Sequence, residues 1–333
     1  MSLPLSVLDL VPVRDVDRPA DALRLTLALA QACDGLGYRR YWMAEHHNMT
    51  GIASAATSVC IGYVAGGTQR IRVGAGGIML PNHSPLVIAE QFGTLASLYP
   101  DRIDLGLGRA PGTDQIAMRA LRRDPHAAEA FVDDIRELQA LFAPAQPGQR
   151  IRAVPGEGID VPLWILGSSL YGAQVAAHFG LPYSFASHFA PDALYEALAM
   201  YRAQFRPSGQ LAQPYAMPGI NVVAADTDEE ARRLFTSLQM RFVAMVRNAR
   251  GKLSPPVDDI EAEWSPMEKA HVQRMLSCAF VGSPDTLRGE LRQFVERTGA
   301  DELIVSSAIY DPAARTRSYE LLAGIAGDLG LKS

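Results

Sequence analysis

Strand-like and helix-like segments alternate along almost the whole chain, and this alternation limits the possible folds more than any other feature. Eight short apolar segments bounded by turn residues are typical of buried strands: Leu3–Val13, Tyr41–Ala44, Ile71–Leu80, Ile103–Leu107, Leu163–Leu166, Tyr183–Ala186, Gly219–Ala225 and Leu303–Ser307. Such alternation favours a parallel sheet covered by helices. Closure of eight strands into a barrel is simpler than an open doubly wound sheet, so we predict an α/β fold of the (β/α)8, or TIM-barrel, type with insertions.

The helical segments between these strands begin and end at recognisable residues. Pro19 begins a helix that Gly35 and Gly37 end, and Ser84-Pro85 predicts the cap and first turn of the helix Leu86–Leu98. The other expected helices are Ala53–Ala65, Gln115–Phe142, Ser169–Phe179, Pro191–Phe205, Asp228–Arg247, Pro266–Leu276, Asp285–Arg297 and a C-terminal helix. We expect Gln115–Phe142 and the stretch around Pro266–Leu276 to include insertions above the barrel.

Length and composition fit one barrel domain over residues 1–333. Hydrophobic residues make up 48% of the chain and the net charge is −5, which argues against nucleic-acid binding. The three cysteines contain no C-x-x-C pair, and we expect reduced thiols in a cytoplasmic protein. The start of the chain does not resemble a signal peptide, and no apolar stretch is long enough to suggest a membrane span.

In a barrel of this type the active site lies where strands end and the following loops begin. The second strand ends in Ala44-Glu45-His46-His47-Asn48, and an imidazole with a pKa near 6.5 suits proton transfer at neutral pH. A polar loop with hydrogen-bonded histidines is the alternative interpretation. A metal site is a poor one, because no other strand ends in a comparable set of ligands.

Three further strand ends carry glycine, arginine and hydroxyl groups. Gly76-Gly77 lies in the second half of the third predicted strand and would let a flat ligand approach the backbone, although a bulge or tight core packing is the alternative. Arg109, between glycines after the fourth strand, suits a phosphate or a surface salt bridge. Ser168 and Ser169 begin the helix after the fifth strand, where they would cradle an anion or only cap the helix. A planar cofactor with a phosphate, such as FMN, would use all of these groups.

At these residues the chain resembles the bacterial luciferase-like flavin-dependent monooxygenases, in particular their single-component, luciferase-like subgroup. The matching segments run in order along nearly the whole chain: Trp42–His47, Gly76–Pro81, Pro85–Gln91, Asp101–Arg109, Gly282–Pro284 and Thr298–Leu303. Each segment is short, but the ensemble is specific.

The resemblance implies a role for each candidate residue. His46 matches a histidine of the family that is implicated in acid–base chemistry, with Glu45 or His47 orienting it. Gly76-Gly77 matches a dipeptide that packs on the flavin and is joined by a cis bond. The residues that match the family's contacts to the FMN phosphate are Arg109, Ser168, Ser169, Tyr171 and Gly172. Two departures, Gly108 in place of a reactive cysteine and Ser168 in place of a carboxylate, make light emission doubtful.

The resemblance also implies the reaction and its participants. We expect a non-luminescent monooxygenase that uses FMN as FMNH2, delivered by a separate NAD(P)H-flavin reductase, and O2. The resemblance does not identify the small-molecule substrate, although an aldehyde is the first expectation for the family. We also expect a homodimer. The alternatives are an FMN-binding protein without oxygenase activity, a deazaflavin-dependent reductase, and a metal-dependent barrel hydrolase that uses His46 and His47.

Overall fold

The computed structural model describes residues 3–110, 115–124, 126–249 and 251–330, and within these ranges it contains nine strands and eleven α-helices. The strands are β1 (Leu5–Asp9), β2 (Arg40–Met43), β3 (Arg72–Met79), β4 (Ile103–Gly108), β5 (Leu163–Gly167), β6 (Tyr183–Phe185), β7 (Ala216–Ala224), β8 (Ala279–Gly282) and β9 (Leu303–Ser306). The helices are α1 (Pro19–Gly35), α2 (Thr57–Gly66), α3 (Pro85–Leu98), α4 (Gln115–Ala120), α5 (Phe131–Phe142), α6 (Leu170–Phe179), α7 (Leu194–Gln204), α8 (Asp228–Val246), α9 (Pro266–Met275), α10 (Pro284–Thr298) and α11 (Pro312–Ile325).

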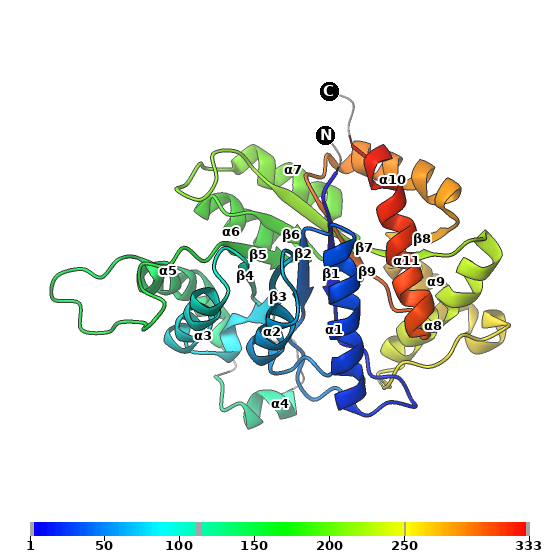
Figure 1. Ribbon diagram of the computed structural model, residues 1–333, viewed down its shortest axis with the longest axis horizontal. Helices are drawn as coiled ribbons and strands as arrows, with labels where there is room; N and C mark the ends of the chain where they lie inside the picture. Colours follow the sequence, from blue (N-terminus) through cyan, green and yellow to red (C-terminus); the bar gives the residue numbers. More distant parts are fainter. Residues whose placement is uncertain (1–2, 111–114, 125, 250, 331–333) are drawn as a thin grey trace.

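Eight of the strands close into a parallel barrel with the helices outside it (Figure 1). Strands β1 to β6 pair in chain order, β6 pairs with β7, and β9 joins β7 to β1. This confirms the predicted (β/α)8 fold. Figure 1 places both chain termini at one end of the molecule and α4, which follows β4, at the other end. The carboxyl ends of the strands therefore face away from the termini.

Side chains fill the interior of the barrel, so it is not a pore. Leu8, Trp42, Trp164 and Ile304 form a buried cluster that comes from barrel strands, and the two tryptophan rings meet edge to face at 5.0 Å. Below this cluster Arg40 is buried between Asp104, at 2.9 Å, and Glu302, at 2.7 Å. A buried arginine is tolerated because two carboxylates compensate its charge. Because side chains fill the interior, we expect a ligand to bind at the carboxyl ends of the strands.

Three expectations about the elements are wrong in detail. The first strand ends at Asp9 rather than Val13, because Val11 adopts a φ of 48° and its N–H donates to the Asp9 carboxylate at 2.8 Å. The expected helix Gln115–Phe142 is divided into α4, a short 3-10 helix and α5, and Arg122 has a φ of 55° after α4 ends. Strand β8 was not predicted; it has four residues, whose burial alternates between intermediate and buried.

The serine caps are also partly wrong. Ser84 and Ser169 occupy the N-cap positions of α3 and α6, but neither side chain makes a capping hydrogen bond. The three cysteines are buried and unbonded to each other. Within the described part of the chain, no helix is both long and apolar enough to cross a membrane.

Candidate functional site

A cavity of about 760 Å³ opens at the carboxyl ends of the barrel strands, and it contains most of the predicted site residues. Every barrel strand contributes to its lining through Leu8, Trp42, Gly76, Gly108, Gly167, Phe185, Gly219 and Ile304. Residues of α8, among them Phe242, and Phe131 of α5 complete the wall. The volume lies in the range of small-molecule sites. Of the predicted residues, the cavity brings together His46, Gly76, Gly77, Arg109, Ser168, Ser169, Tyr171 and Gly172.

One wall of the cavity is the bare backbone of Gly76 and Gly77. The peptide bond between them is cis, and the register of β3 against β4 shifts between Ala75 and Ile78. A Cβ on Gly76 would lie 2.8 Å from a methyl carbon of Leu8, and one on Gly77 would lie 2.7 Å from the carbonyl oxygen of Gly106. Neither position has space for a side chain, so a flat ligand can approach the main chain itself.

An arginine, two serines and the N-terminus of α6 lie together at one edge of the same cavity. The Arg109 guanidinium lies 4.2 Å from the centroid of the Tyr171 ring, and it has no carboxylate partner among the described residues. Ser169 is the N-cap of α6, with extended backbone at φ −149°, and neither its hydroxyl nor that of Ser168 has a hydrogen-bond partner in the described protein. The N-terminus of a helix favours negative charge. The simpler alternatives, a surface salt bridge and plain side-chain capping, are therefore not what the structure has.

Glu45 precedes His46 in the chain, and the expectation that Glu45 or His47 orients His46 stays a prediction. Glu45 is buried, and its carboxylate accepts hydrogen bonds from His47 Nε2 at 2.6 Å, from His83 Nε2 at 2.8 Å and from the Met79 N–H at 3.0 Å. These contacts tie the loop after β2, which carries His46, to the segment after β3. Glu45 and His47 do not line the cavity.

The charges of this cluster follow from its contacts. Burial alone would raise the pKa of the Glu45 carboxyl, but the hydrogen bonds from His47, His83 and Met79 outweigh it and lower the pKa to about 2. The hydrogen bond to Glu45 raises the pKa of His47. Among the described residues, Glu45, His47 and His83 are the one group whose ligand atoms lie close enough together to hold a metal ion. Because His46 is not part of the group and the group lies outside the cavity, the geometry does not support the hydrolase that would use His46 and His47.

Sequence reasoning missed His188, which follows β6 and lines the cavity. Its Nδ1 atom is buried and has no hydrogen-bond partner. Burial, together with the charge of His46, lowers the pKa of His188 to about 4. The rule that pointed to His46 applies equally to Ser184–His188 at the end of the sixth predicted strand, and it would have found this residue.

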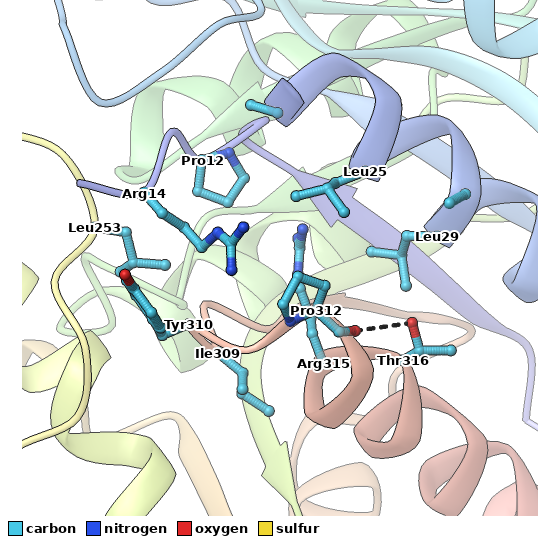
Figure 2. A pocket seen from close by; sticks show the side chains of 12 residues that line it. Pro12, Arg14, Leu25, Leu29, Leu253, Ile309, Tyr310, Pro312, Arg315 and Thr316 are labelled. Atoms are coloured by element: carbon cyan, nitrogen blue, oxygen red, sulfur yellow. Dashed lines mark hydrogen bonds between the residues drawn. The ribbon is translucent and has the colours of Figure 1, made fainter. Parts of the chain in front are cut away.

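A second pocket, lined by residues of α1 and α11, does not offer a comparable site (Figure 2). Its volume of about 60 Å³ suits water rather than a cofactor. Its two arginines are already paired, Arg14 with Asp17 at 2.7 Å and Arg315 with Asp9 at 2.9 Å.

Comparisons with known proteins match one family and several relatives over most of this chain. The profile of the family described as luciferase-like monooxygenase matches residues 5–302. The chain is 51% identical over 325 residues to a luciferase-like monooxygenase of Escherichia coli (strain K12), covering 97% of each protein. It is 52% identical over 322 residues to the protein YvbT of Bacillus subtilis (strain 168), covering 96% of each. The crystal structure of apo-MsnO8 superposes with a TM-score of 0.89 at 36% identity, covering 99% of this chain and 100% of that chain.

Proposed function

Because this chain belongs to the luciferase-like monooxygenase family, we propose that it is a non-luminescent flavin-dependent monooxygenase that uses FMNH2 and O2 on a small organic substrate. The observation that carries the proposal is the convergence, on one cavity, of a backbone surface at Gly76-Gly77 and a cationic edge at Arg109. A planar ring with a phosphate tail needs both features. Gly108, which precedes Arg109, supplies no thiol near the flavin.

The residues present fit FMN. Arg109, both hydroxyls of Ser168 and Ser169, and the N–H groups at the start of α6 would hold the phosphate. Tyr171, in contact with the Arg109 guanidinium, keeps that side chain at the edge of the cavity. Gly172 lets α6 lie close to β5, since a Cβ there would be 3.2 Å from the Cα of Gly167. The isoalloxazine ring would pack on Gly76-Gly77.

Bound reduced flavin supplies two electrons to O2, so that one oxygen atom enters the substrate and the other leaves as water. The protein contributes position, proton control and a dry site. His46 lines the cavity and is the group that we assign to proton transfer. The Glu45–His47–His83 cluster fixes the loop that carries it. Leu8, Leu166 and Phe185 give the cavity apolar walls that exclude water.

We also propose a cytoplasmic homodimer that receives FMNH2 from a separate NAD(P)H-dependent reductase. Support for the dimer comes from exposed apolar side chains on two helices that contact each other. These are Val59 and Tyr63 on α2, which are 71% and 44% exposed, and Val87 and Leu98 on α3, which are 42% and 64% exposed. Contiguous exposed apolar surface is typical of interfaces between proteins, and we propose that these side chains of adjacent helices contribute to one.

An anaerobic titration with FMNH2, followed by O2, tests the flavin assignment. We expect binding at micromolar concentrations, and then substrate-dependent consumption of O2. His46→Gln should keep flavin binding but lose about a hundredfold or more in turnover, as expected for loss of a proton-transfer group. Binding without substrate-dependent O2 consumption would favour a flavin-storage protein, and preference for a deazaflavin would favour a reductase. Absence of flavin binding at micromolar levels would refute the proposal.

A further inference from the structure

The charged side chains that line the cavity all carry the same sign. They are Arg109, Arg241 and Lys252, and no aspartate or glutamate is among the lining residues in the described part of the chain. The whole chain is acidic, with 36 acidic and 31 basic residues, so this excess of positive charge is local to the cavity. A cleft lined by one sign of charge concentrates ligands of the opposite sign. The phosphate proposed at Arg109 accounts for only one of these cations.

Lys252 lies on the side of the mouth opposite to the helix that would hold the phosphate. It belongs to the segment after α8, in which Leu253 donates its backbone N–H to the Val13 carbonyl oxygen, in the loop after β1, at 2.9 Å. Arg109 instead contacts Tyr171 of α6, which follows β5. In the eight-stranded barrel β5 lies four places from β1, so Lys252 and the proposed phosphate site are on opposite sides of the cavity.

The Lys252 ammonium is held in place without being neutralised. Its Nζ donates to the backbone carbonyl oxygen of Asp17 at 2.7 Å, while the Asp17 carboxylate is itself paired with Arg14 at 2.7 Å. Among the described residues Lys252 forms no ion pair with a carboxylate. An ammonium carries three N–H donors, so donors remain for a ligand at this exposed rim of the cavity.

Apolar side chains lie next to this cation on the cavity wall. An added Cβ on Gly51, in the loop after β2, would lie 3.3 Å from the Lys252 Cα, so the two segments are in contact. The lining residues of that loop and of α8 are mostly apolar, among them Met49, Ile52, Leu238, Phe242 and Met245. Methionine side chains adapt to ligands of different shape. A ligand on this side meets an apolar wall with a positive charge at its rim.

We propose that the substrate is an organic anion with an apolar body, and that Lys252 binds its anionic group at the rim opposite Arg109. The inference rests on the proposed function, because it takes the phosphate of FMN to occupy Arg109. Arg241 adds charge of the same sign in the same cavity. A carboxylate is the simplest group of this kind, since its hydrogen bond with an ammonium is stronger than that of a neutral oxygen. Lys252 determines specificity and takes no part in the proton transfer assigned to His46.

The test uses protein saturated with FMNH2 in the absence of O2, so that the phosphate site is occupied and binding is measured without turnover. Two probes of the same shape, hexanoate and hexanamide, are titrated by calorimetry at pH 7, where hexanoate is ionised. We expect wild type to bind hexanoate about threefold to tenfold more tightly than hexanamide, as for a charged hydrogen bond at an exposed site. Lys252→Met should remove most of this preference by weakening hexanoate alone, and Lys252→Arg, which keeps the charge, should retain it.

Lys269→Met is the matched control, because it changes the net charge equally. Lys269 lies on α9, pairs with Glu261 at 2.8 Å and does not line the cavity. The control variant should bind both probes as wild type does. Added salt should reduce the preference of wild type for hexanoate, because an exposed charge is screened.

The other outcomes each contradict a specific step. The inference would be overturned if wild type did not bind hexanoate more tightly than hexanamide. It would also be overturned if Lys252→Met weakened both probes together, which indicates a structural role, or if Lys269→Met lost the preference equally, which indicates an effect of net charge alone. Wild-type protein that bound no FMNH2 would refute the proposed function itself, and that failure is visible before either probe is added.

Discussion

Replacement of Glu45 by glutamine tests the cluster that fixes the loop of His46. The buried carboxylate is stabilised by hydrogen bonds from two histidines and one backbone N–H, and its pKa falls from the ordinary value of 4.5 to about 2. Since one pKa unit corresponds to about 1.4 kcal/mol, the ionised carboxylate contributes about 3 kcal/mol to folding. Glu45→Gln should lower the free energy of unfolding by about this amount, measured by urea denaturation near pH 5.5.

The pH dependence of this loss has a defined sign. Because the folded-state pKa of Glu45 is lowered, the ionised carboxylate stabilises the fold above pH 4.5. This stabilisation is lost as the pH falls from 4.5 to about 2. The pKa of His47 is raised above 6.5, so its positive charge stabilises the fold below pH 6.5. This stabilisation is lost as the pH rises through the raised pKa. The free energies of unfolding of wild type and Glu45→Gln should therefore differ most between pH 4.5 and pH 6.5.

Glu129 provides a matched control, because it also pairs with a histidine, His126, at 2.8 Å, but both side chains are exposed. An exposed pair contributes little to stability, so Glu129→Gln should unfold as wild type at every pH. If Glu45→Gln were as stable as wild type, or if its deficit did not change between pH 6 and pH 3, the carboxylate would not be the stabilising group that the geometry indicates.

Three other substitutions test separate parts of the molecule. Arg109→Ala should weaken FMN binding by about tenfold to a hundredfold, as loss of a charged hydrogen bond implies, and unchanged affinity in a fluorescence titration would contradict its role. Gly77→Ala should destabilise the fold by about 1–3 kcal/mol because its Cβ meets the Gly106 carbonyl at 2.7 Å, whereas Gly289→Ala, with open space in α10, should not destabilise it in thermal unfolding. Val59→Asp should yield monomers in analytical ultracentrifugation while the equally exposed Val16→Asp stays dimeric, and a monomeric wild type would refute the dimer.

The fold could be predicted because its signals are local. Each barrel strand is a short apolar run between turn residues, and eight such runs separated mostly by helices specify parallel pairing without knowledge of any contact. Strand β8 was not predicted although its burial alternates along the strand; it has four residues and lies at the edge of the sheet, next to β7. The location of the site followed from the same logic, since the carboxyl ends of parallel strands meet at one end of the barrel.

What the sequence by itself determined is therefore the barrel and the strand ends that meet at its mouth, including His46, Gly76-Gly77 and Arg109. Only the tertiary structure decided which partner each polar group takes. Glu45 pairs with His83, which is 38 positions away in the chain, and the Ser169 side chain makes no capping hydrogen bond. The Nδ1 atom of His188 is buried without a hydrogen-bond partner, and it packs against Gly219 on another strand. The physical reason is that strand and helix patterns repeat within a few residues, whereas burial and hydrogen bonding depend on neighbours that are brought together only by folding.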